Sequence, residues 1–363
     1  MKINFIDLKA QYKEYQTEID SEVLDVFKNA QFIGGEKLNK LEADLATYTG
    51  AKYAIGCSSG TDALLLSLMA LGIKAGDEVI TTPFTFIATA EVIAFLGATS
   101  VFVDIEEDSY NIDPTKIEAA ITDKTKVIIP VSLYGQTADM DAINAVASKH
   151  DIIVIEDACQ SFGATYKGKK SCNLSTIGCT SFFPSKPLGA YGDGGAIFTS
   201  DEKIAEKLRM LLNHGQNERY KHKYVGINGR LDAVQAAVLN VKLKYFDKEV
   251  AARHEIGSRY SSLLCDADVI TPTIAEQNQS VFAQYSIRVK DREAMVAKLT
   301  KAEIPTAVHY PVPLHLQEAF ADLGYKKGDF PISEKVSSEI MSLPMSPYLT
   351  RDEQDFIVNS IKG

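Results

Sequence analysis

The sequence predicts an α/β fold built on a mostly parallel sheet of seven strands. Short apolar runs rich in β-branched residues recur through the first 200 residues, and turn residues bound each of them. Helix-like stretches lie between these runs, and a parallel sheet covered by helices requires this alternation. The predicted strands are residues 51–57, 78–82, 100–103, 126–131, 152–155, 180–183 and 196–199. The predicted helices between them are residues 61–71, 89–96, 114–121 and 139–149.

The pattern becomes helical after residue 200 and is mixed further on. Apolar residues three and four positions apart predict a long helical connector over residues 201–259. A strand at 281–289, a helix at 292–302 and an extended segment held by prolines at 305–310 follow it. These elements predict a smaller α+β unit at the C-terminal end.

The length of 363 residues corresponds to about two domains. We expect a large domain at residues 1–250 and a small C-terminal domain at residues 251–363. Residues 1–35 have helical character but are too few to fold alone, so we expect them to pack on one of the two domains.

Composition and charge exclude several classes of protein. The 38 Lys and Arg against 48 Asp and Glu give a net charge of −10, which argues against a nucleic-acid-coating protein. No apolar run approaches the roughly 20 residues of a membrane helix, and the N-terminus lacks the sections of a secretion signal, so we expect a cytoplasmic protein. Five Cys without a C-x-x-C pair indicate neither a disulfide framework nor a metal site.

A loop with the character of a phosphate site follows the first predicted strand. Residues 58–62 read Ser-Ser-Gly-Thr-Asp and precede an Ala- and Leu-rich helix, so the N–H groups of Gly60 and Thr61 open that helix. The start of a helix favours a bound phosphate. The alternative is that Ser59 or Thr61 only caps the helix.

An acidic residue ends the strand predicted at 152–155. Residues 156–160 read Glu-Asp-Ala-Cys-Gln, which places Asp157 at the carboxyl end of a strand, where open α/β sheets bind ligands. The alternative is a surface turn residue, although an acid that ends so apolar a run needs a partner if it is buried.

A single lysine follows the aromatic run at 180–183. Lys186 lies between Pro184 and Pro187, with glycines close behind it, and these residues fix its backbone. A desolvated lysine can lose its proton near neutral pH and form a Schiff base with a carbonyl. The alternative is a solvated turn lysine, since most lysines are exposed.

Together these three features match the three anchors that pyridoxal phosphate needs. The helix start would hold its phosphate, Asp157 its ring nitrogen and Lys186 its aldehyde.

The whole chain, from Phe5-Ile6-Asp7-Leu8 to Tyr348, resembles the DegT/DnrJ-type nucleotide-sugar aminotransferases of pyridoxal-phosphate fold type I. Residues 171–176 and 186–189 are similar to enzymes that aminate UDP-2-acetamido-2-deoxy-3-oxo-glucuronate. Residues 315–331 instead look like aminotransferases of dTDP-3-oxo-6-deoxyhexoses. The resemblance implies a transaminase that moves an amino group from L-glutamate to the C3 ketone of a nucleotide-linked sugar, for surface polysaccharide biosynthesis.

The resemblance also assigns roles around the cofactor. Lys186 would form the Schiff base with pyridoxal phosphate and carry the proton between cofactor and substrate carbons. Asp157 would keep the ring nitrogen protonated, and Gln160 would reach the phenolic oxygen of the ring or pack beside it. The remaining cofactor-binding residues implied are Gly60, Thr61 and Ser181 at the phosphate and Phe86 stacked on the ring. For Phe86 the alternative is a simple core aromatic.

Members of this family share each active site between two subunits, so the resemblance implies a homodimer. Asn228 resembles the residue that reaches the phosphate of the neighbouring subunit's cofactor. Arg230 would bind a carboxylate of the amino donor or of a uronate, and its alternative is an ion pair with Asp232 or another acid. His309 and Tyr310 are candidates for contacts with the sugar.

Other functions remain as alternatives. Within the same chemistry the substrate would be a dTDP-3-oxo-6-deoxyhexose or a 4-oxo nucleotide sugar. Sugar dehydratases of the family carry His where this chain has Lys186, which argues against a dehydratase or lyase. A non-catalytic regulatory protein with this fold is another alternative. It is disfavoured because Lys186, Asp157 and the phosphate loop are all present. A dehydrogenase is disfavoured because no G-x-G-x-x-G follows the first strand.

Overall fold

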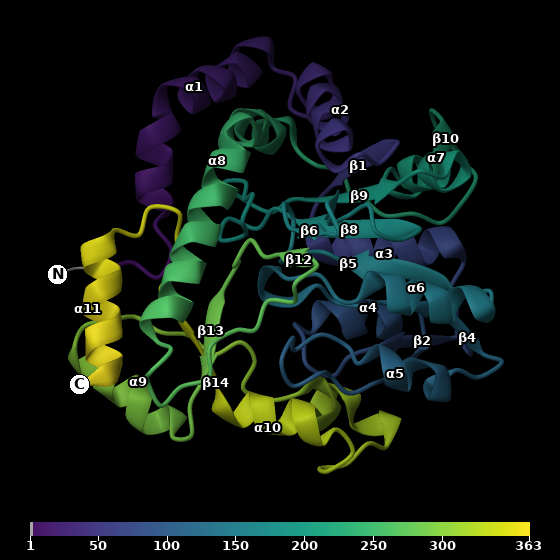
Figure 1. The fold of residues 1–363 in the computed structure, drawn as a ribbon. Helices are drawn as coiled ribbons and strands as arrows, with labels where there is room; N and C mark the ends of the chain where they lie inside the picture. The colour runs from purple at the N-terminus through teal and green to yellow at the C-terminus, as the bar shows by residue number, and fades with distance from the viewer. Residues whose placement is uncertain (1–2) are drawn as a thin grey trace.

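A seven-stranded sheet forms the centre of the computed structural model, which describes residues 3–363 (Figure 1). In spatial order its strands are β1 (Tyr53–Cys57), β9 (Gly195–Thr199), β8 (Ile177–Ser181), β5 (Ile153–Asp157), β4 (Thr125–Ile128), β2 (Glu78–Thr81) and β3 (Thr99–Phe102). Strand β9 pairs antiparallel with both of its neighbours, and the other pairs are parallel. The predicted α/β class with a mostly parallel seven-stranded sheet is confirmed.

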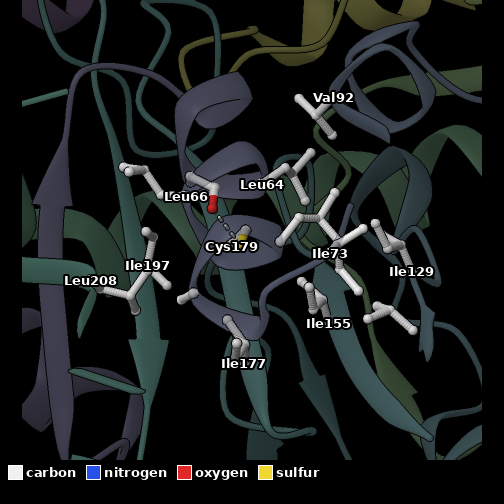
Figure 2. Packing of buried hydrophobic residues seen from close by; sticks show 14 of the residues in the cluster. Leu64, Leu66, Ile73, Val92, Ile129, Ile155, Ile177, Cys179, Ile197 and Leu208 are labelled. Atoms are coloured by element: carbon white, nitrogen blue, oxygen red, sulfur yellow. Dashed lines mark hydrogen bonds between the residues drawn. The ribbon is translucent and has the colours of Figure 1, made fainter. Parts of the chain in front are cut away.

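Helices cover both faces of this sheet. Three helices cover the first face, with α3 (Gly60–Leu71) in contact with both α4 (Ala88–Phe95) and α7 (Glu202–Leu211). Figure 2 shows their apolar side chains packed against alternate residues of the strands, such as Ile155 of β5 and Ile177 of β8. Each fully buried aliphatic side chain of this kind contributes about 1.5–3 kcal/mol.

The intervening strand residues face the opposite side. Val154 of β5 and Ile128 of β4 pack against α5 (Pro114–Ile117) and α6 (Met140–Lys149), and α2 (Glu36–Thr49) covers the end of the sheet near β1. Because side chains of a strand alternate between faces, consecutive residues at the end of β5 also belong to opposite faces.

The long helix α8 (Ala233–Leu263) links the sheet to the C-terminal elements (Figure 1). Helix α1 (Leu8–Asn29) packs along α8, which confirms that the N-terminal segment lies against the rest of the fold. The C-terminal elements are β13 (Tyr285–Arg288), α9 (Arg292–Lys301), α10 (Pro331–Glu339), β14 (Ile340–Leu343) and α11 (Arg351–Lys362). The boundary predicted between residues 250 and 251 lies inside α8, and the division into two domains stays a prediction.

Two expected elements differ from the structure. The strand predicted at 180–183 is β8 at Ile177–Ser181, because the Phe182 N–H bonds to the Gly194 carbonyl and the chain leaves the strand there. The helical connector expected over 201–259 is interrupted by a hairpin of β10 (Gln216–Glu218) and β11 (Lys221–His222). Tight backbone packing at Gly215, where a Cβ would lie 1.8 Å from the Tyr224 carbonyl oxygen, explains this break.

The remaining strands form a small sheet beside α6. They are β6 (Thr165–Tyr166), β7 (Lys169–Lys170) and β12 (Asn278–Gln279).

None of the helices within residues 3–363 combines the length and apolarity that a membrane crossing needs.

Candidate active site

The carboxylate of Asp157 is fixed at the carboxyl end of β5. The residue is only 4% exposed. Thr89 Oγ1 of α4 donates a hydrogen bond of 2.8 Å to Asp157 Oδ2, and the Cys159 N–H donates one of 3.2 Å to Oδ1. The turn-residue alternative for Asp157 is therefore wrong: the structure buries this acid and orients it from two sides.

The N-terminus of α3 lies close to Asp157. Ser59 Oγ accepts from the Asp62 N–H at 3.0 Å, so the predicted helix cap is present. The first N–H groups of a helix have no intrahelical partner, and Gly60 and Thr61 supply these. A Cβ on Gly60 would lie 2.7 Å from Ser181 Cβ and 2.9 Å from Cys159 Sγ, so only glycine permits this approach. The expected Gly60, Thr61 and Ser181 are thus together, in an arrangement suited to a phosphate.

A compact loop carries Lys186 to the same edge of the sheet. The Ala190 N–H donates to the Phe182 carbonyl at 2.7 Å and closes the loop, and the Lys186 N–H donates to the Phe183 carbonyl at 2.8 Å. Burial lowers the pKa of Lys186, while its neighbours Cys159 and Asp157 act in the opposite direction. The solvated-turn alternative is therefore wrong, and a larger share of this amine is neutral at a given pH than for an exposed lysine.

Gln160 connects two aromatic residues beside the site. Its Oε1 accepts from the Tyr134 N–H at 3.0 Å, and its Nε2 donates to the Tyr310 hydroxyl at 3.1 Å. The Tyr310 ring lies 6.1 Å from the Phe86 ring between centroids, and Phe86 is 53% exposed. Phe86 is therefore not a core aromatic, and its ring is accessible to a flat ligand.

His309 belongs to the same group of side chains. Its Nδ1 lies 2.9 Å from Ser342 Oγ, and its backbone carbonyl accepts from the Tyr134 hydroxyl. Burial first, and the positive charge of Lys186 second, lower the pKa of His309. The structure therefore favours a neutral imidazole close to Lys186.

Asn228 and Arg230 lie apart from these residues, on the segment between the hairpin and α8. The Ser58 N–H donates to the Gly229 carbonyl at 2.9 Å, which places this segment beside the phosphate loop. Within residues 3–363 the exposed Asn228 has no hydrogen bond to the group around Lys186. Arg230 Nη1 donates to Asn213 Oδ1 at 2.7 Å, and the described chain contains no ion pair of Arg230, so the ion-pair alternative is wrong.

Glu156, the neighbour of Asp157, faces the other side of the sheet. Its fully buried carboxylate accepts from Ser132 Oγ at 3.0 Å, Ser171 Oγ at 2.7 Å and the Cys172 N–H at 2.8 Å. Burial raises the pKa of Glu156 to about 7, against the effect of these hydrogen bonds. Residues 171–172, which open the run that is similar to UDP-sugar enzymes, therefore hold Glu156 on the far face of β5.

Sequence reasoning missed Thr89 and Tyr134 as parts of this site, and Glu156 as the buried acid behind it. Thr89 and Tyr134 are far from their partners in sequence, so local patterns carry no signal for these contacts. For Glu156 a signal existed, because a second acid directly after an apolar strand alternates to the opposite face and needs its own partners.

Comparisons with known proteins agree with one another. The model of the DegT/DnrJ/EryC1/StrS aminotransferase family matches residues 13–362. UDP-2-acetamido-2-deoxy-3-oxo-D-glucuronate aminotransferase of Pseudomonas aeruginosa is 54% identical over 96% of each chain. A protein of Geobacillus stearothermophilus named pleiotropic regulatory protein is 48% identical over 99% of this chain and 98% of its own. The solved structure of S. venezuelae DesV with a ketimine intermediate has a TM-score of 0.97 at 37% identity, covering 99% of this chain and 98% of that one.

The raised pKa of Glu156 predicts a pH-dependent stability. Because the pKa is about 7 in the fold and 4.5 as the ordinary value, the folded state binds this proton more tightly than the unfolded state. The free energy of unfolding then falls as pH rises between these values. We expect Glu156→Gln to remove the part of this pH dependence that Glu156 contributes. Denaturant unfolding across this pH range measures the free energy of unfolding, with the exposed Glu206→Gln as the control. An unchanged slope in Glu156→Gln would contradict the assignment.

Proposed function

This chain belongs to the DegT/DnrJ/EryC1/StrS aminotransferase family, and on that basis we propose that it is a pyridoxal-phosphate-dependent transaminase of nucleotide-linked sugars. It moves an amino group from L-glutamate to the C3 ketone of the sugar. The observation that carries the proposal is the convergence of Lys186, Asp157 and the start of α3 at one edge of the sheet.

The residues at this edge fit pyridoxal phosphate. The close approach of Gly60 to Ser181 brings the N–H groups of the helix start beside Ser181, as a phosphate site requires, and Asp157 is held as a hydrogen-bond acceptor. The cofactor, when bound, supplies a carbonyl that exchanges amino groups and a ring that withdraws electrons from the reacting carbon. Gly60, Thr61 and Ser181 would hold its phosphate, and Phe86 would stack on its ring.

The chain itself supplies the proton transfers. Asp157 holds a proton on the ring nitrogen, because a buried carboxylate stabilises the positive charge there. The Lys186 amine, with its lowered pKa, accepts a proton from the substrate carbon and returns it. Gln160 holds the Tyr310 hydroxyl, and the half-buried His309 and Tyr310 would limit the access of water to the cofactor.

We assign UDP-2-acetamido-2-deoxy-3-oxo-glucuronate as the sugar, for surface polysaccharide biosynthesis. The relative from Pseudomonas aeruginosa with this substrate in its name supports the assignment. Arg230 supports it as well, because its guanidinium lacks an acid partner in the described chain and matches a carboxylate. The alternative substrate is a dTDP-3-oxo-6-deoxyhexose, which residues 315–331 resemble.

The active enzyme, in this proposal, is a homodimer with shared active sites. Asn228 is exposed and lies beside a hairpin segment whose Tyr220 and Val225 are 78% and 90% exposed. Two exposed apolar side chains on this segment suit contact with a second subunit. Asn228 then binds the cofactor phosphate in the partner's site.

We predict that Lys186→Ala abolishes turnover and leaves the fold intact, because no other amine takes its place at the site. The assay mixes enzyme and L-glutamate, follows loss of the cofactor's visible absorbance, and then adds each 3-oxo sugar. Return of the band with the UDP-glucuronate derivative supports the proposed substrate, and return only with a dTDP-6-deoxy sugar supports the alternative. Near-normal activity of Lys186→Ala would refute the mechanism.

Shared active sites predict complementation between two inactive variants. Lys186→Ala and Asn228→Ala homodimers should each lose activity. When the two are unfolded together and refolded as a mixture, heterodimers contain one site with both native residues. Activity of the mixture should then exceed that of either variant alone. A mixture no more active than its components would contradict sharing through Asn228.

The role of Arg230 predicts a selective loss with Arg230→Gln. Removing a charge-assisted pair costs about 1.5–3 kcal/mol, or roughly 10- to 100-fold in kcat/KM for the uronate substrate. The half-reaction with L-glutamate and amination of the matched 6-hydroxyl sugar should change little. Stopped-flow absorbance measures the half-reactions separately. If the glutamate half-reaction alone is lost, Arg230 binds the donor instead.

A further inference from the structure

A second buried lysine lies behind the Lys186 loop. Lys242 of α8 is 2% exposed, and its Nζ donates a hydrogen bond to the Gly189 carbonyl. The same Nζ lies 5.0 Å from the centre of the Tyr191 ring. Burial lowers the pKa of Lys242 to about 8. A buried ammonium is costly unless it is paired, so this contact requires an explanation.

The carbonyl that Lys242 binds belongs to the loop that carries Lys186. Gly189 is packed so tightly that a Cβ would lie 2.4 Å from the Pro184 carbonyl oxygen and 2.8 Å from that of Phe183. Phe183 in turn accepts from the Lys186 N–H. A shift at Gly189 is therefore transmitted through backbone contacts to Lys186.

A second side chain of α8 holds the end of the same loop. Gln235 Oε1 accepts from the Tyr191 N–H at 2.9 Å, and its Nε2 donates to the Tyr191 carbonyl at 3.4 Å. Gln235 and Lys242 are seven residues apart, which puts them on one face of the helix. Leu239 lies between them and belongs to the same buried cluster as Leu188 of the loop.

Charged residues near Lys242 connect α8 to residues from both ends of the chain. Glu249 raises its pKa and Arg253 lowers it, and both are buried on the same helix. Glu249 accepts from Gln11 Nε2 of α1 at 2.8 Å and from the Tyr348 hydroxyl at 2.7 Å. Helix α8 is thereby fixed to the N-terminal helix and to the C-terminal segment.

We propose that Lys242 is a positioning residue for Lys186: with Gln235 it holds the loop of residues 182–191 against α8, so that the Lys186 amine stays buried at the cofactor site. The role of the loop in catalysis rests on the function proposed above. Lys242 itself touches neither cofactor nor substrate.

The test uses Lys242→Met, which keeps a side chain of similar length without the charge or the donor. Its control is Lys244→Met, because Lys244 is exposed on the same helix and forms an ion pair with Glu18 of α1. The main readout is the pH midpoint at which the apo-enzyme captures pyridoxal phosphate on Lys186, trapped with borohydride and located by mass spectrometry. Burial is the largest influence on the pKa of Lys186, and Lys242 is not among the groups whose charge acts on it, so a shift of the midpoint in Lys242→Met reports movement of the loop.

For Lys242→Met we expect the midpoint to rise toward the ordinary lysine value and kcat to fall roughly 10- to 100-fold, with KM for L-glutamate nearly unchanged. Lys244→Met should match the wild type. If Lys242→Met does not fold, Gln235→Leu weakens the second anchor without removing a buried charge and should shift the midpoint in the same direction. A wild-type midpoint and kcat in a folded variant overturn the inference. Failure of the wild type to capture the cofactor overturns the proposed function instead.

Discussion

The structure depends on keeping one amine out of water beside one carboxylate. Lys186 lies on the loop after β8 and Asp157 ends β5, and burial lowers the pKa of Lys186. Isolated buried charges are unfavourable, so the fold surrounds them with fixed donors and with the start of α3. The seven-stranded sheet is the frame that brings these three elements to one edge. Chemistry at this edge is therefore set by the packing beneath it.

The two consecutive acids at the end of β5 face opposite sides of the sheet and have different partners. Asp157 points to the α3 and α4 side, where Thr89 orients it. Glu156 points to the other side and gathers Ser132, Ser171 and the Cys172 N–H. The Ser132 N–H also donates to the Asp157 carbonyl, so the same serine joins both acids. The far-face contacts thus fix the backbone from which Asp157 projects.

Local sequence patterns predicted the strands and the positions of Gly60, Asp157 and Lys186, because each lies at or shortly after the carboxyl end of a strand. The partners that orient them were not predictable, since Thr89 lies 68 residues from Asp157 and Gly189 lies 53 residues from Lys242. The hairpin between α7 and α8 was missed for another reason. His214 and Tyr220 adopt positive φ angles, which non-glycine residues rarely do and which no local pattern indicates.

The placement of residues 171–176 changes what their similarity to UDP-sugar enzymes means. Ser171 and Cys172 are buried against Glu156 on the far face, so they stabilise the frame of the site and touch no substrate. Similarity there reports common architecture among relatives. Discrimination between a carboxylate and a methyl group requires side chains with free polar atoms that reach the ligand. Arg230, whose guanidinium has no acid partner in the described chain, has the chemistry that this discrimination needs, and the proposed assignment of the sugar rests on the segment before α8.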